Sequence, residues 1–249
     1  MSLREPVPPA TTGDKLAAWG VHLLTASGIL FALLAMEALE DGRLTDCLLW
    51  LGAALVIDGV DGTLARKAQV KTVLPRIDGE ALDLIIDYIN FVLIPALFIW
   101  RGGFLPDGWG LPLAALILLS SLYVFVRRDM KTEDGYFRGF PALWNVVALY
   151  VFALAPPPFA AALLVLVLVI LTFAPVHVVH PFRVRDYGVW LPLSAGAWFF
   201  ASAALLLPDL PAALRGSLSG VSLATAAVIL LMGLLRTLRG PRQDSANSL

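Results

Sequence analysis

Long apolar stretches, separated by short groups of charged residues, glycine or proline, make up most of the chain from about position 19 onward. A helix needs about 17–25 mainly apolar residues to cross the hydrocarbon core of a bilayer, and several of these stretches reach that length. The pattern predicts an all-α, polytopic helical integral membrane protein with about eight transmembrane helices. The predicted spans are 19–38, 45–61, 82–100, 111–126, 140–154, 159–176, 189–207 and 218–235.

Composition favours one membrane domain over a soluble core. Hydrophobic residues make up 59% of the chain, charged residues make up 15%, and the mean hydropathy is +0.80. These values lie outside the range of ordinary soluble domains. We expect a membrane domain at 14–239, preceded by a disordered segment at 1–13 and followed by a flexible tail at 240–249. The single Cys47 cannot form an internal disulfide.

Arginine and lysine are distributed unevenly among the segments that join the predicted spans. With the N-terminus in the cytoplasm, fifteen of the 18 basic residues fall in the inner segments. Only Arg43, Arg101 and Arg215 fall in the outer loops. Because positive residues accumulate on the cytoplasmic side of membrane proteins, both termini are predicted to lie in the cytoplasm.

Four aspartates interrupt the apolar pattern between positions 58 and 87. Asp58 and Asp61 are three residues apart, and Asp83 and Asp87 are four apart, so each pair lies on one helix face. If the two helices are antiparallel neighbours, the carboxylates meet, and their mutual repulsion favours bound divalent cations. Helix capping is the alternative, but it explains one aspartate at a helix start and not two spaced pairs within apolar runs. The spacing predicts a metal site.

Two glycines and an arginine accompany these aspartates. Gly62 and Gly79 would let the backbone approach a nucleotide closely, and Arg66 could pair with a phosphate. Tight helix packing is the alternative for the glycines, and anchoring at the cytoplasmic face is the alternative for the arginine. Two hard cations held by carboxylates would suit phosphoryl transfer from a pyrophosphate donor.

Together these positions resemble the signature of the CDP-alcohol phosphotransferase family, whose members transfer a substituted phosphate from a CDP-linked donor to an alcohol and release CMP. All eight signature positions are present: Asp58, Asp61, Gly62, Ala65, Arg66, Gly79, Asp83 and Asp87. The resemblance implies a six-helix membrane core, here with extra helices, that is usually a homodimer. It also implies Mn²⁺ or Mg²⁺ as the cofactor, with two ions per site.

The resemblance assigns a role to each signature residue. Asp58, Asp61 and Asp83 would be metal ligands, and Asp87 would be both a ligand and the general base. The residues that would contact the CDP moiety are Gly62, Ala65, Arg66 and Gly79.

One departure from the signature points to a particular branch of the family. Twelve residues separate Arg66 from Gly79, a longer gap than most of the family has. The gap is similar to that of a bacterial branch whose members join CDP-diacylglycerol to free choline. Further similarity to this branch lies at 21–28, 73–76, 139–145 and 177–181. The distribution of basic residues places the aspartates on the cytoplasmic side. The resemblance implies a bacterial inner membrane, with membrane lipids around the site, and we expect no nucleic-acid partner.

Choline is a quaternary ammonium and donates no conventional hydrogen bond, so aromatic faces are its best binding partners. Tyr88, Trp144 and Tyr187 fall near predicted cytoplasmic helix ends and are candidates for a choline-binding cage. The alternative role for each is an interfacial or packing aromatic.

Two other functions fit parts of the pattern. Another member of the same family would use serine, inositol or glycerol phosphate as the acceptor, and a phosphorylated acceptor would require a more basic pocket. A cation transporter would use the intramembrane aspartates to bind its ion. Arg66 and the paired glycines favour a nucleotide substrate over a transported ion.

Overall fold

The computed structural model describes residues 10–240 of the 249-residue chain. In chain order, the described elements are α1 (Thr12–Glu40), α2 (Leu44–Lys67), α3 (Val70–Val73), α4 (Gly79–Tyr88), the π-helical turn η1 (Ile89–Leu93), α5 (Ile94–Arg101), α6 (Gly110–Val126), β1 (Tyr136–Arg138), α7 (Trp144–Leu154), α8 (Pro158–Phe173), β2 (His177–Val179), α9 (Trp190–Ala204) and α10 (Ala212–Arg239). The predicted disordered segment 1–13 and flexible tail 240–249 lie largely outside the described residues. Thr12 and Gly13 already belong to α1.

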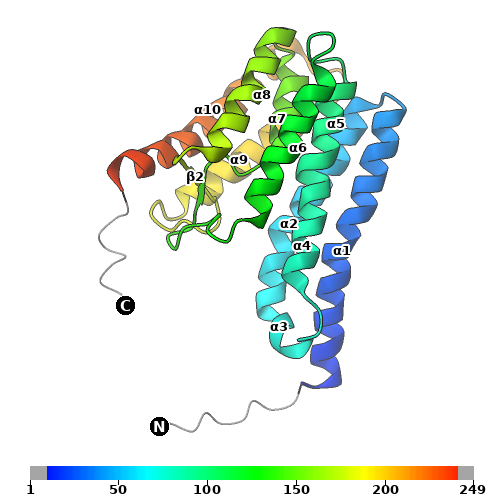
Figure 1. The fold of residues 1–249 in the computed structure, drawn as a ribbon, viewed down its shortest axis with the longest axis vertical. Coiled ribbons are helices and arrows are strands. Elements are labelled where there is room, and N and C mark those ends of the chain that lie inside the picture. The colour runs from blue at the N-terminus through cyan, green and yellow to red at the C-terminus, as the bar shows by residue number, and fades with distance from the viewer. Residues whose placement is uncertain (1–9, 241–249) are drawn as a thin grey trace.

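Helices α1 and α2 form an antiparallel pair that extends beyond the rest of the bundle (Figure 1). A tight turn joins them, in which Gly42 has a φ of +72°. The guanidinium of Arg43 donates hydrogen bonds to Asp41 and Asp46 at this turn. Helix α4 also packs against α1. Helix α1 therefore contacts both helices that carry the aspartate pairs.

The predicted third span is helical over Gly79–Arg101, but it is not a uniform α-helix. The π-helical turn η1 separates α4 from α5, and Pro95 lies in the first turn of α5. Proline has no amide hydrogen for the helical ladder, so the helix is disturbed just before it. Within η1, Asn90 donates hydrogen bonds of 3.1 Å to the carbonyl oxygens of Gly28 and Ile86. The bond to Gly28 fixes the level at which α1 packs against this segment.

Within residues 10–240, four helical segments are long and apolar enough to cross a membrane: Thr12–Glu40, Leu44–Lys67, Gly79–Arg101 and Ala212–Arg239. The shorter helices α6, α7 and α8 are also apolar. The chain is therefore an all-α, polytopic membrane protein, as predicted, while the count of eight spans stays a prediction.

The predicted fifth span begins later than the hydrophobic pattern indicates. Its helix, α7, begins at Trp144 rather than at Phe140. Ala142 has a φ of +58°, which interrupts helical geometry, and the amide of Phe140 donates instead to the carbonyl oxygen of Leu171 in α8. The predicted break at the three prolines 156–158 lies where α7 ends and α8 begins.

The loops 127–143 and 174–189 contain an antiparallel strand pair that the sequence pattern did not predict. Tyr136 pairs with Val179, and Arg138 pairs with His177. Each strand has three residues, which is too short for a recognisable alternation of polar and apolar positions. Strand β2 packs against α10, where Gly233 lies directly against the backbone of His177. We call these two loops the cap.

Candidate metal and nucleotide site

Three of the four signature aspartates come together between α2 and α4. Each of Asp58, Asp83 and Asp87 offers a carboxylate oxygen that lies within 4.8 Å of the oxygens offered by the other two. All three side chains are half-buried. The three-residue group therefore joins one residue of the first pair to both residues of the second.

The fourth signature aspartate, Asp61, has a different environment. Its side chain is 4% exposed, and one carboxylate oxygen accepts a 2.6 Å hydrogen bond from the hydroxyl of Thr25 in α1. Asp61 is near enough to act electrostatically on Asp58, Asp83 and Asp87. The structure thus places Asp61 beside the three-carboxylate group, with its orientation fixed by Thr25.

The donor set suits a hard divalent cation. Carboxylate oxygens are the ligands that Mg²⁺ and Mn²⁺ prefer, and three of them can converge here without rearrangement of the backbone. Half-burial also limits the solvent that could screen their mutual repulsion. The residues therefore fit the divalent metal that the sequence predicts.

The predicted nucleotide-binding residues lie on both sides of the aspartates. Gly79 is the first residue of α4, and a Cβ atom there would lie 2.8 Å from the ring of His22. Arg66 is exposed and donates a 3.0 Å hydrogen bond to the hydroxyl of Thr63. Ala65 packs in a small apolar cluster between α1, α2 and α3. Because His22 leaves no room for a Cβ atom at position 79, Gly79 is required for the close packing of α1 against the start of α4.

Gly62 is less constrained by its surroundings than Gly79. The nearest atom to a Cβ placed on Gly62 would be Nη1 of Arg66, at 3.6 Å, which is an ordinary van der Waals distance. Packing alone therefore does not require a glycine at this position, and its role in nucleotide binding stays a prediction.

Basic residues from the cap extend the site beyond the signature. The charges of Lys131 and Arg183 both act on Asp83, and that of Lys131 also acts on Asp58 and Asp87. Burial lowers the pKa of the Lys131 ammonium, and the Arg183 charge lowers it further. The Lys131 ammonium lies 5.3 Å from the ring centre of an aromatic cap residue, Phe137.

His180 connects to the same part of the cap. Its ring stacks on Phe137, with ring centres 5.3 Å apart. Burial, together with the charges of Arg183 and Lys131, lowers the pKa of His180 to about 4. The imidazole is therefore neutral at pH 7, and the positive charge of this region comes from lysine and arginine.

The three predicted choline-binding aromatics do not meet at one place. Trp144 is fully buried, and its indole N–H donates a 2.9 Å hydrogen bond to Ser121. Tyr88 donates to the carbonyl oxygen of Leu118 and packs edge-on against a phenylalanine of α6. Tyr187 packs in a separate cluster that contains Tyr136. The structure places Trp144 in the core, and the choline-binding role of the three residues stays a prediction.

The site residues predicted from the sequence do not include Thr25, His22 or Lys131. Thr25 and His22 lie one turn apart on an apolar helix and contact Asp61 and Gly79 respectively. A polar pair at helical spacing in an apolar span is a signal that sequence reasoning could have used. Lys131 has no comparable local signal, because its place depends on how the cap folds.

Comparison with known proteins agrees with the signature. The family model for CDP-alcohol phosphatidyltransferases matches residues 21–174. A phosphatidylcholine synthase from Pseudomonas aeruginosa is 48% identical over 212 residues, which cover 76% of this chain and 89% of that protein.

Phosphatidylcholine synthases from other bacteria are also similar to this chain. A phosphatidylcholine synthase from Mesorhizobium japonicum is 42% identical over 200 residues, covering 78% of this chain and 75% of that protein. One from Rhizobium johnstonii is 40% identical over 189 residues, which cover 76% of this chain and 77% of that protein. On these matches, and with the aspartate signature assembled between α2 and α4, the chain belongs to the CDP-alcohol phosphatidyltransferase family.

Proposed function

We propose that this protein transfers the phosphatidyl group from CDP-diacylglycerol to choline and releases CMP, the activity of a phosphatidylcholine synthase. The observation that carries the proposal is the convergence of Asp58, Asp83 and Asp87 within a signature shared with named phosphatidylcholine synthases. The proposed cofactor is Mn²⁺ or Mg²⁺, with two ions at the site. When bound, the metal neutralises the pyrophosphate of the donor and polarises the reacting phosphorus.

The protein's own residues hold the donor and move one proton. Asp58, Asp61 and Asp83 supply oxygen ligands, and the hydroxyl of Thr25 keeps the carboxylate of Asp61 in place. Lys131 supplies a positive charge from the cap, close enough to act on Asp58, Asp83 and Asp87. Close packing of His22 against Gly79 fixes the position of the first turn of α4 relative to α1.

Asp87 is the proposed general base. It accepts the hydroxyl proton of choline as the choline oxygen forms a bond to the phosphorus that bears diacylglycerol. The bond from this phosphorus to the oxygen bridging it to the cytidine-bound phosphate breaks, and CMP leaves with the electron pair. Asp87 lies in the last turn of α4 beside Asp58, so base and metal ligand share one location.

The acceptor is tested by offering the purified protein several alcohols at once. The protein is incubated with CDP-diacylglycerol, Mn²⁺ and a mixture of labelled choline, serine, inositol and glycerol phosphate. We expect label from choline in the lipid product. A product labelled mainly by another alcohol would retain the phosphotransferase assignment and reject choline.

Choline selectivity is expected to depend on an aromatic face near Asp87. Replacing Tyr88 by Leu should raise the choline KM about ten-fold and leave the KM for CDP-diacylglycerol nearly unchanged, since a lost cation–π contact costs roughly 1–2 kcal/mol. Tyr88→Phe is the matched control, because it keeps the ring and removes only the hydrogen bond to Leu118. Equal choline KM values in the Leu and Phe variants would exclude Tyr88 from the cage. The same comparison applies to Tyr187.

We also propose that both termini and the aspartate site lie on the cytoplasmic side of the bacterial inner membrane, in a homodimer. The uneven distribution of basic residues supports this orientation. Single cysteines placed at Lys71 and Lys131 should be protected from a membrane-impermeant thiol reagent in intact cells, whereas one at Gly108 should react. These are introduced in a Cys47→Ala background, since the native thiol is buried but present. The opposite labelling pattern would reverse the proposed orientation.

A further inference from the structure

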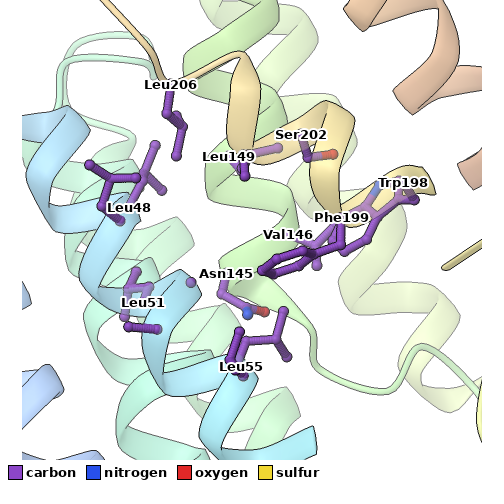
Figure 2. Close-up of a pocket in the computed structure, with 15 residues that line it drawn as sticks. Leu48, Leu51, Leu55, Asn145, Val146, Leu149, Trp198, Phe199, Ser202 and Leu206 are labelled. Atoms are coloured by element: carbon purple, nitrogen blue, oxygen red, sulfur yellow. The ribbon is translucent and has the colours of Figure 1, made fainter. Parts of the chain in front are cut away.

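An apolar cavity with a volume of about 210 Å³ lies between α2, α7 and α9 (Figure 2). Its lining residues fall between positions 48 and 56 of α2, between 145 and 149 of α7, and between 198 and 206, which covers the end of α9 and the turn after it. Leucine, valine and aromatic side chains make up most of the walls. Leu49 and Val56, on the α2 side, are each 46% exposed, so the rim of the cavity is apolar surface on a candidate membrane span. A hydrocarbon chain is the ligand chemistry that such a cavity favours.

The cavity lies on the helix that carries the first aspartate pair. Its α2 wall ends at Val56, two residues before Asp58. From Val56 to Leu48 the wall runs about 12 Å along the helix axis, at about 1.5 Å per residue. One end of the cavity is therefore close to the proposed site of phosphoryl transfer, and the other end is deeper in the span.

A single buried amide marks one end of this apolar space. Asn145 is 6% exposed, and its Oδ1 atom has no hydrogen-bond partner among the described residues. Figure 2 shows its side chain between the levels of Leu51 and Leu55, away from Leu206. The Nδ2 atom of the same amide is a hydrogen-bond donor, so this lining side chain can donate to a ligand carbonyl. An acyl ester offers such a carbonyl directly before its hydrocarbon chain.

The α9 wall lies outside the segment 21–174 that matches the family model. Hydrogen bonds hold it against α7 and α10. The indole of Trp198 donates to the hydroxyl of Tyr150 at 2.8 Å, and the Ser202 and Ser222 hydroxyls lie 2.8 Å apart. Tyr150 also bonds to Ser222. This hydrogen-bond network therefore holds the α9 wall in place, although α9 lies outside the part of the chain that matches the family model.

We propose that the cavity receives one acyl chain of CDP-diacylglycerol, with the ester at Asn145 and the chain directed toward Leu206, so that α9 selects the donor by chain length. The inference rests on the proposed function, which supplies the identity of the donor. The donor is favoured over a bulk phospholipid because its phosphates must reach the aspartates two residues beyond the cavity wall.

Filling the cavity tests this assignment. A Cβ at Gly52 would meet nothing within 4 Å, so Gly52→Phe can place its ring in the space without a backbone clash. We expect kcat/KM for dipalmitoyl CDP-diacylglycerol to fall about ten-fold relative to that for the dioctanoyl donor. The phenylalanine ring occupies space in which methylene groups of the longer chain would otherwise be buried. The choline KM should not change. Gly196→Phe is the matched control, since Gly196 lies in α9, does not line the cavity and has equally open surroundings.

A second variant covers the case in which Gly52→Phe fails to fold. Ala203→Phe enters the cavity from the α9 wall and should change the same chain-length ratio. An unchanged ratio in either folded variant overturns the proposal.

Crosslinking gives a readout that does not depend on turnover. CDP-diacylglycerol with a photoreactive diazirine on one acyl chain should crosslink to peptides covering 48–56 and 198–206, and much less in the Gly52→Phe variant. A diazirine-labelled phosphatidylglycerol serves as the bulk-lipid arm, and equal labelling by it would overturn the assignment to the donor. If the wild-type protein makes no phosphatidylcholine but the donor still crosslinks here, the proposed function fails and the acyl-chain site stands. If the protein makes phosphatidylcholine normally but the donor does not crosslink to these segments, the proposed function stands and the acyl-chain site fails.

Discussion

Turnover is expected to fall at least about 100-fold when Asp87 is replaced by Asn, because the change removes both a carboxylate ligand and the proposed base. Asn substitution of Asp58, Asp61 or Asp83 should each have an effect of the same order. Removal of divalent cations with a chelator should abolish activity in the wild-type protein, and added Mn²⁺ or Mg²⁺ should restore it. The measurement is release of CMP by purified protein at saturating CDP-diacylglycerol and choline.

Asp78→Asn is the matched control for these variants. Asp78 is exposed, lies close in sequence, and accepts a 3.0 Å hydrogen bond from the amide of Ala81 at the start of α4. Asparagine caps a helix about as well as aspartate, so this variant removes a nearby charge and retains the cap. It should retain near-normal turnover. Near-normal turnover in any two of the four signature variants would contradict the proposed site.

Gly139→Ala should destabilise the folded protein by roughly 2–3 kcal/mol or more, through two independent effects. Gly139 has a φ of +80°, where a residue with a Cβ is strained. A Cβ there would also lie far inside van der Waals contact with the backbone carbonyl oxygen of Thr172 in α8. Backbone atoms cannot move aside as a flexible side chain can. We expect a large fall in the midpoint of thermal unfolding, followed by near-ultraviolet circular dichroism in detergent.

A second glycine separates the two causes. Gly103 has a similar φ of +75°, but a Cβ there would meet nothing within 4 Å. Gly103→Ala should therefore lose only the conformational part, about 1 kcal/mol. If the two alanine variants unfold at the same temperature, close packing of the cap against α8 is not important for stability.

The arrangement of membrane helices follows closely from the hydrophobic pattern. Each predicted span overlaps a helix of the structure, since burial in lipid imposes one simple requirement on a long segment. The irregular features do not follow in the same way. The π-helical turn at Ile89–Leu93 and the delayed start of α7 depend on contacts with Gly28 and Leu171, which are distant in sequence.

The candidate site also has features that follow from the local sequence and features that depend on contacts between distant segments. The spacing of the aspartates predicted that each pair lies on one helix face, because side-chain direction on a helix is fixed by its period. The convergence of Asp58, Asp83 and Asp87 follows because the two helices are also neighbours. The environment of Asp61 was not predictable, since its partner Thr25 comes from a third helix. Lys131 reaches the site only through the fold of the cap, which has no regular periodicity.

The central claim, transfer of a phosphatidyl group to choline, is tested most directly by following the two phosphates of the donor separately. CDP-diacylglycerol is prepared with a phosphorus label either next to diacylglycerol or next to cytidine, and is incubated with purified protein, choline and Mn²⁺. We predict that the first label appears in phosphatidylcholine and the second in CMP, with one CMP released for each lipid formed. Formation of no choline lipid, or cation flux into proteoliposomes without CMP release, would contradict the account.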